Sequence, residues 1–295
     1  MDRLLIVIAS VLVFAGAVLG LRPLLLRLSQ RDMRRQQAKP IPAHWLSLLS
    51  TSVPAARHLT ESERTALLRA SRELIETRHW EGCQGLVLSE DMQLAIAAHA
   101  CLLTVALPGE PFPGLREILV YPRTFVPHRV CDPRKWLATS EPERPLPELG
   151  ESWSNGIMVL SWEAALQGAM DPTDGHNVVL HESAHELAFE HDLTPTNLLL
   201  RGLLAGRGGE WRPRVANPAD WSRTLEISYE RICAKVEAHT PSVLHPYAAT
   251  DLAEFFAVAT EVFFERPQEL NHEDPDLYGL LRTFYRQNPA VWAAA

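Results

Sequence analysis

Along residues 59–80, charged and apolar positions alternate with the period of an amphipathic helix. Leu67 and Leu74 lie two turns apart and therefore on one side of such a helix. Thr60 or Ser62 can cap its first turn, because a side-chain hydroxyl accepts hydrogen bonds from the free backbone N–H groups there. The pattern therefore predicts a strong helix with a leucine-lined inner side.

Residues 89–107 are richer in apolar positions, which predicts a second helix that is buried. His99 lies in its apolar part and is expected to be a core histidine with satisfied hydrogen bonds, not a ligand. Two short apolar runs, residues 116–122 and 156–162, have the length and composition of strands. Helical patterns continue to the end of the chain. The predicted fold class is α+β, mainly helical with a small sheet.

The N-terminus carries a different pattern. Residues 4–21 form an uninterrupted, uncharged apolar run of about the length that crosses a bilayer core. A cleaved signal peptide is the alternative, but the start carries only Asp2 and Arg3, and no convincing A-x-A site follows. We therefore expect a retained transmembrane anchor over residues 1–21.

A basic stretch follows this run and is expected to be a juxtamembrane linker over residues 22–44. Arginine and lysine far outnumber acidic residues there, so the positive-inside rule places this flank in the cytoplasm. The remaining residues, 45–295, are expected to form one domain that faces the cytoplasm while tethered to the membrane.

Charge and cysteine content exclude several classes of protein. The formal net charge of −8 argues against a dedicated nucleic-acid binder, which usually carries a basic balance or stripe. No cysteine pair has C-x-x-C spacing, so a thiolate zinc site is not expected, nor is a small disulfide scaffold. Free thiols in a reducing compartment are expected for Cys83, Cys101, Cys131 and Cys233.

The stretch "NVVLHESAHELAFEHD", residues 177–192, carries a candidate metal site. His181 and His185 lie one helical turn apart, so both can reach one metal ion. Glu182 is placed to contact a water on that ion, which is why H-E-x-x-H spacing is typical of metallopeptidase helices. The alternative is a plain amphipathic helix that happens to hold two histidines. Upstream, Asp171, Thr173 and Asp174 offer capping groups.

A third ligand is expected from "YAATDLAEFFAVATEVFFERP", residues 247–267, where Asp251 can cap a helix. Glu254 and Glu261 lie two turns apart on a very apolar helix, where a carboxylate is costly to bury unless it is paired or ligates a metal. Glu254 would complete a His₂Glu zinc set, and Glu261 could orient a histidine. The other nearby donors are expected to be surface residues: Glu186, His191, Asp192 and His245.

These two motifs together resemble the Mlc titration factor A (MtfA) family of zinc-dependent peptidases, which are gluzincin-like. The likeness extends through "LTESERTALLRASRELI", "REILVYPRTFV" and "ESWSNGIMVLSW" and covers roughly residues 45–290. It implies a zincin-like fold with one Zn²⁺ per chain. The roles it implies are metal ligands and a catalytic pair: His181, His185 and Glu254 as ligands, Glu182 as general base, and Tyr247 as hydrogen-bond donor to the oxyanion.

The resemblance also implies partners. The run "GIMVLSW", residues 156–162, is similar to the edge strand along which zincins hold an extended peptide. The expected function is thus a membrane-tethered zinc metallopeptidase acting on a peptide or protein, with no nucleic-acid partner. The alternative is a regulatory binding protein that sequesters a partner, such as a transcriptional repressor, on the same scaffold.

Overall fold

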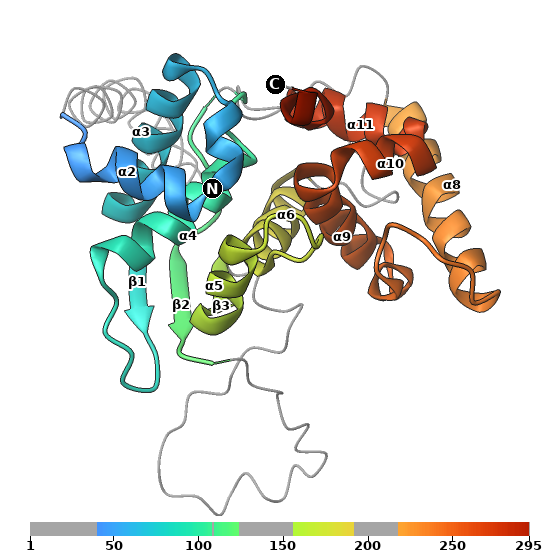
Figure 1. The fold of residues 1–295 in the computed structure, drawn as a ribbon. Coiled ribbons are helices and arrows are strands. Elements are labelled where there is room, and N and C mark those ends of the chain that lie inside the picture. Colours follow the sequence, from blue (N-terminus) through green and yellow to red (C-terminus); the bar gives the residue numbers. More distant parts are fainter. Residues whose placement is uncertain (1–39, 108, 124–155, 192–217, 295) are drawn as a thin grey trace, which may run out of the picture. The chain divides into compact units, whose positions relative to one another are not determined.

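The computed structural model describes most of the chain in four segments: residues 40–107, 109–123, 156–191 and 218–294. From Ala43 onward these segments belong to one unit, in which helices accompany a small sheet (Figure 1). The predicted anchor over residues 1–21 and most of the predicted linker lie outside the described residues. Within the described segments, no helix is both long and apolar enough to cross a membrane.

Three strands form a parallel sheet in the order β1-β2-β3: β1 (His79–Gly82), β2 (Glu117–Tyr121) and β3 (Ile157–Ser161). Ile118 of β2 pairs with Trp80 on one side and Met158 on the other. Strand β2 is buried along most of its length, as a central parallel strand should be. Strand β3 forms one edge of the described sheet, and its burial alternates along the strand.

Of the three described strands, β2 and β3 were predicted from the sequence pattern and are confirmed. Strand β1 was not predicted. The four residues of β1 include His79 and Glu81, and neither suggests a strand by composition. The predicted helix over residues 59–80 therefore ends early. Helix α3 (Glu61–Thr77) ends before Arg78, because the backbone of Arg78 is extended and leads into the sheet.

Side chains cap the N-terminal ends of the first long helices. Thr60, one of the two predicted caps, caps α3, since its Oγ1 accepts from the Glu63 backbone N–H and the Glu63 carboxylate accepts from the Thr60 N–H. Ser89 caps α4 (Glu90–Leu102) through its Oγ, which accepts from the Met92 backbone N–H. Before them, α2 (Ala43–Ser52) and a 3₁₀ turn, η1 (Pro54–His58), complete the N-terminal part. Helix α2 begins inside the predicted linker.

Helix α4 is buried on all sides near its end, as predicted. His99 is 5% exposed, and its Nδ1 lies 3.0 Å from the Ala95 carbonyl oxygen. Burial lowers the pKa of His99 to about 4, so the ring is neutral and Nδ1–H donates this bond. The expectation of a buried core histidine is confirmed, and the structure gives a hydrogen bond for its Nδ1.

The rest of the described chain is helical. Its elements are α5 (Trp162–Met170), α6 (Val178–His191), α8 (Pro218–Glu237), η4 (Pro246–Ala249), α9 (Leu252–Glu265), α10 (Pro267–Glu273), α11 (Pro275–Tyr285) and η5 (Pro289–Ala294). Helix α6 packs against α9 and β3 (Figure 1). The fold is therefore mainly helical with a small parallel sheet.

An aromatic cluster fixes helix α9. Phe256 packs against Phe284 and Trp221 with ring centroids 5.6 Å and 6.3 Å away, and Phe263 packs against Tyr285 at 5.7 Å. All five side chains are nearly or fully buried, and each such aromatic contributes a few kcal/mol of hydrophobic burial. With one side of α9 held in this core, its other side is presented to α6.

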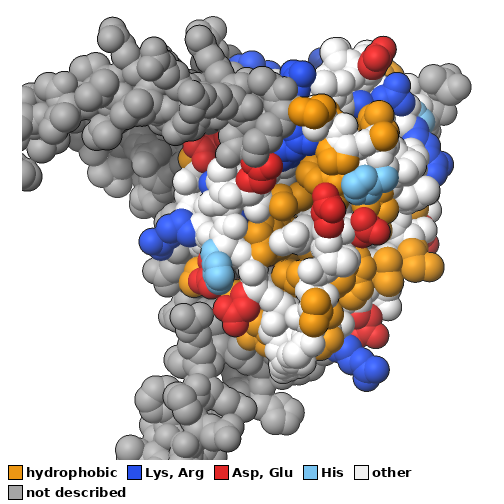
Figure 2. Space-filling model, turned by 90° about the vertical axis from the view of Figure 1, so that its left-hand side faces the viewer, with side chains coloured by type: hydrophobic (Ala, Val, Ile, Leu, Met, Phe, Trp, Pro, Cys, Tyr) orange, Lys and Arg blue, Asp and Glu red, His pale blue; other side chains and the backbone are white. Residues whose placement is uncertain are grey.

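The surface of the described part is mixed in character. On the face drawn in Figure 2, hydrophobic side chains lie among acidic, basic and histidine side chains. Large apolar side chains are exposed at scattered positions, such as Val87 and Met170. Apolar side chains exposed singly are ordinary on protein surfaces, so they do not mark a partner.

Candidate metal centre

The candidate metal helix α6 begins at Val178 and is capped by Asn177. The Asn177 side-chain Oδ1 accepts from the backbone N–H groups of Val179 and Leu180, both at 3.2 Å. Just before it, Gly175 has φ +82°, a left-handed conformation that glycine adopts without strain. The cap was expected from Asp171, Thr173 or Asp174, and that expectation is wrong because the turn at Gly175 places those groups before the helix start.

Helix α9 supplies the facing carboxylates. Asp251 caps it as predicted, accepting from the backbone N–H groups of Ala253 and Glu254. Glu254 lies in the first turn, and Glu261 lies two turns later on the same side. Because α9 packs against α6, both carboxylates face the histidines.

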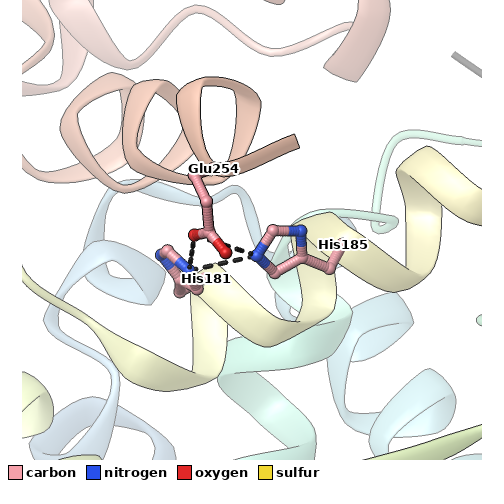
Figure 3. Close-up of side chains that lie close together, drawn as sticks. All are labelled: His181, His185 and Glu254. Carbon is pink, nitrogen blue, oxygen red and sulfur yellow. Dashed lines mark hydrogen bonds and ion pairs between the residues drawn. The ribbon is translucent and has the colours of Figure 1, made fainter. Parts of the chain in front are cut away.

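His181, His185 and Glu254 point toward one another from the two helices (Figure 3). His181 Nε2 lies 3.0 Å from Glu254 Oε2 and 3.1 Å from His185 Nε2, and His185 Nε2 lies 3.4 Å from Glu254 Oε2. Tetrahedral zinc with ligand bonds of about 2.0–2.1 Å would separate its ligand atoms by about 3.3–3.4 Å. The three atoms therefore sit near the spacing that one such ion requires.

The charges in this cluster also favour a cation. Burial alone would lower the pKa of His181, but hydrogen bonds with Glu254 and Glu261 raise it to about 10. Burial would raise the pKa of Glu254, yet its hydrogen bonds with His181 and His185 lower it to about 2. In the metal-free site a proton on His181 thus supplies the positive charge between two carboxylates. A divalent ion can take its place.

Glu261 holds the far side of the His181 ring. Its Oε1 lies 2.7 Å from His181 Nδ1, and its Oε2 accepts from the Asn177 backbone N–H at 2.6 Å. A carboxylate on Nδ1 fixes the tautomer in which Nε2 is free to bind a metal. The structure thus brings together the predicted ligands with the carboxylate that orients one of them.

Glu182 and Tyr247 border the same cleft, an opening of about 450 Å³ that His181 also lines. Glu182 is 6% exposed, on the turn between the two histidines. The Tyr247 ring lies 6.2 Å from the His181 ring and is 46% exposed. Burial of its hydroxyl group, and then the charge of Glu254, raise the pKa of Tyr247 to about 12, so the hydroxyl keeps its proton.

The other possible metal ligands near the site differ in their exposure to solvent. His245 is exposed, as expected. Glu186 was expected at the surface, and that expectation is wrong: it is 1% exposed, because it lies on the side of α6 that faces the interior. The side chains of His191 and Asp192 lie outside the described residues.

Two residues that were not predicted, Asn177 and Glu265, complete the start of α6. Glu265 Oε1 accepts from Asn177 Nδ2 at 3.1 Å, and Oε2 accepts from the Gly175 backbone N–H at 3.1 Å. An asparagine directly before an apolar helical run is a capping signal, so Asn177 could have been found. The role of Glu265 depends on the packing of α9 against the Gly175 turn, which no sequence pattern reveals.

Comparisons with known proteins point to a family of metallopeptidases. The family model described as "Glucose-regulated metallo-peptidase M90" matches residues 27–286. The chain is 32% identical to an "Uncharacterized protein slr2042" of Synechocystis, across 88% of this chain and 90% of that protein. It is 30% identical to the "Mlc titration factor A" of Serratia proteamaculans, across 84% and 88%. The protein of that name from Pectobacterium atrosepticum is 28% identical, across 83% and 86%.

Proposed function

Because this chain belongs to the glucose-regulated metallopeptidase M90 family, we propose that it is a zinc metallopeptidase that hydrolyses peptide bonds. The observation that carries the proposal is the spacing of 3.0–3.4 Å among His181 Nε2, His185 Nε2 and Glu254 Oε2. Two imidazoles and one carboxylate are a ligand set that catalytic zinc uses. Glu261 would orient His181 from behind.

Bound zinc would supply a Lewis acid that lowers the pKa of a coordinated water to about 7 and polarises the scissile carbonyl. Glu182 is the proposed general base: its carboxylate would take the proton of the attacking water and pass it to the leaving amine. Its position between the two histidines, in the cleft that His181 lines, supports this role. Tyr247 would donate a hydrogen bond from its hydroxyl group to the carbonyl oxygen as charge develops there. Its raised pKa supports a donor role.

The substrate is proposed to be an extended peptide or an unfolded protein segment. Strand β3 lies at an edge of the described sheet and packs next to α6, so a peptide added to that edge would run beside the metal centre. Strand addition draws affinity from backbone hydrogen bonds and therefore tolerates many side chains.

The enzyme is further proposed to be tethered to the membrane through residues 4–21, with the catalytic domain in the cytoplasm. The support is the uncharged apolar run and the basic flank after it. A reporter fused at the C-terminus tests the orientation. A reporter that works only in the cytoplasm should be active when it is fused there. The topology would be refuted if activity were seen only with a reporter that works outside the cytoplasm.

A second candidate function is a regulatory binding protein that captures a partner, such as a transcriptional repressor. The observation that favours it is the name "Mlc titration factor A" carried by relatives about 30% identical to this chain. Glu182→Gln separates the two functions. Partner capture would survive this substitution, whereas peptide hydrolysis would not.

The deciding experiment measures zinc content and hydrolysis of unstructured peptides with the full chain. Wild type and Glu182→Gln should each hold about one zinc, and kcat of the variant should be lower by about 100-fold or more, since general-base catalysis contributes about 10²–10⁴-fold. His185→Ala should lose the metal, and Glu226→Gln on the surface should behave as wild type. Undiminished hydrolysis by Glu182→Gln, or no zinc after reconstitution, would overturn the proposal.

A further inference from the structure

A second cavity, of about 240 Å³, is bounded by η1, α4, α6, α9 and η5 and contains none of the candidate metal ligands. Its walls are largely carbon, with Leu102, Leu180, Phe264 and Trp292 among them. An apolar cavity of about 150 Å³ in another protein holds benzene. This cavity therefore has room for an aromatic ring with a short side chain.

Glu265 lines this apolar cavity. It accepts hydrogen bonds from Gly175 and Asn177, but it forms no ion pair with any lysine, arginine or histidine among the described residues. Burial, and then the charges of Asp174 and Glu261, raise its pKa to about 8. A partly buried carboxyl without a cationic partner is costly to ionise, so a cation bound beside Glu265 would offset that cost.

His99, another polar residue that lines the cavity, offers a further acceptor. His99 is neutral and donates Nδ1–H to Ala95, which leaves its Nε2 as an acceptor. Arg57, which also lines the cavity, is exposed and donates Nε–H to the Ser50 carbonyl oxygen. The cavity thus has hydrogen-bond acceptors in its lining, and its walls are otherwise apolar and aromatic. These groups suit a ligand that brings N–H donors and a positive charge.

We propose that this cavity binds a small primary amine, with its ammonium group on the Glu265 carboxylate and its apolar body against Phe264 and Trp292. The rings of these two residues lie 6.3 Å apart and tilted by 41°, so they form two neighbouring apolar walls. A ligand there would touch the start of the metal helix, because Glu265 holds Asn177 and Asn177 caps α6. The proposal does not depend on peptidase activity.

The test compares three probes of matched shape by titration calorimetry on the full chain: phenethylamine, 2-phenylethanol and 3-phenylpropionate. Wild type should bind the amine at least tenfold more tightly than the alcohol, and the carboxylate most weakly. Glu265→Gln keeps the volume and removes the charge, so the amine should lose its advantage over the alcohol. Ala55→Phe fills the cavity from η1 and should abolish binding of both. Glu226→Gln, at the surface, is the matched charge control.

Proton release tests the same carboxyl without altering it. With a pKa of about 8, Glu265 is protonated in most molecules at pH 7, so amine binding should release most of one proton per ligand, measured in two buffers of different ionisation enthalpy. The other ionisable groups that line the cavity or act on Glu265 are Arg57, His58, His99, Asp174 and Glu261. Three results would each overturn the proposal: equal affinity for amine and alcohol, binding that survives Ala55→Phe, or amine binding without proton release.

Discussion

The carboxyl group of Glu265 predicts how the stability of this protein depends on pH. Its folded-state pKa is about 8, against an ordinary value of 4.5. The folded protein therefore holds this proton more tightly than the unfolded chain does. The protonated carboxyl contributes stability in full below pH 4.5, and the contribution is lost as the pH rises toward 8. At about 1.4 kcal/mol for each step of one in pKa, the whole contribution is about 5 kcal/mol.

The variant Glu265→Gln removes the titration and keeps the side-chain volume. Between pH 5 and pH 7, the free energy of unfolding of wild type should fall by about 2.5 kcal/mol relative to this variant. Gln cannot accept both N–H groups that Glu265 binds, which adds an offset that does not change with pH. The slope with pH is therefore the informative quantity.

The assay is urea unfolding of the metal-free protein at pH 5, 6 and 7, with EDTA in every sample. The surface variant Glu226→Gln serves as control and should follow wild type. Asp174, Glu261 and the cavity residues Arg57, His58 and His99 are present in both proteins, so their titration largely cancels in the difference. A difference that stays flat from pH 5 to pH 7 would refute the reasoning, because Glu265 would then titrate near its ordinary pKa.

Three further predictions concern the metal centre and the first long helix. Glu261→Gln should weaken zinc binding about 10- to 100-fold in competition with a chelator, because His181 loses the carboxylate that orients it; unchanged affinity would remove that role. Tyr247→Phe should lower kcat about 100-fold while zinc content stays the same, as expected for loss of one oxyanion donor; an unchanged kcat would exclude the hydroxyl. Thr60→Ala should lower the free energy of unfolding by about 1 kcal/mol through loss of the α3 cap, measured by denaturant titration. Ser50→Ala, on the exposed side of α2, is its control, and equal stability of the two variants would contradict the prediction.

Local chemistry in the sequence determined much of the secondary structure. Either Thr60 or Ser62 was predicted as one cap and Asp251 as another, because a helix start needs side-chain acceptors whatever surrounds it. Thr60 and Asp251 are the caps in the structure. The pair His181 and His185 was predicted to face one way because helical spacing alone fixes that geometry. Strand β1 was missed because its four residues become a strand only by pairing with β2.

The candidate site was predictable in its residue types but not in its connections. A glutamate on an apolar helix suggests a ligand, since its burial is otherwise costly, and Glu254 does meet both histidines. The position of Glu261 on His181 Nδ1, the burial of Glu186, and the carboxyl of Glu265 at the start of α6 all depend on how α9 packs against α6. The amino-acid sequence thus established which chemical groups the chain carries and how neighbours along a helix are spaced. Which carboxylate pairs with which partner, and which lies in a cavity, became clear from the folded chain, because contacts between distant segments depend on packing and burial rather than on local spacing.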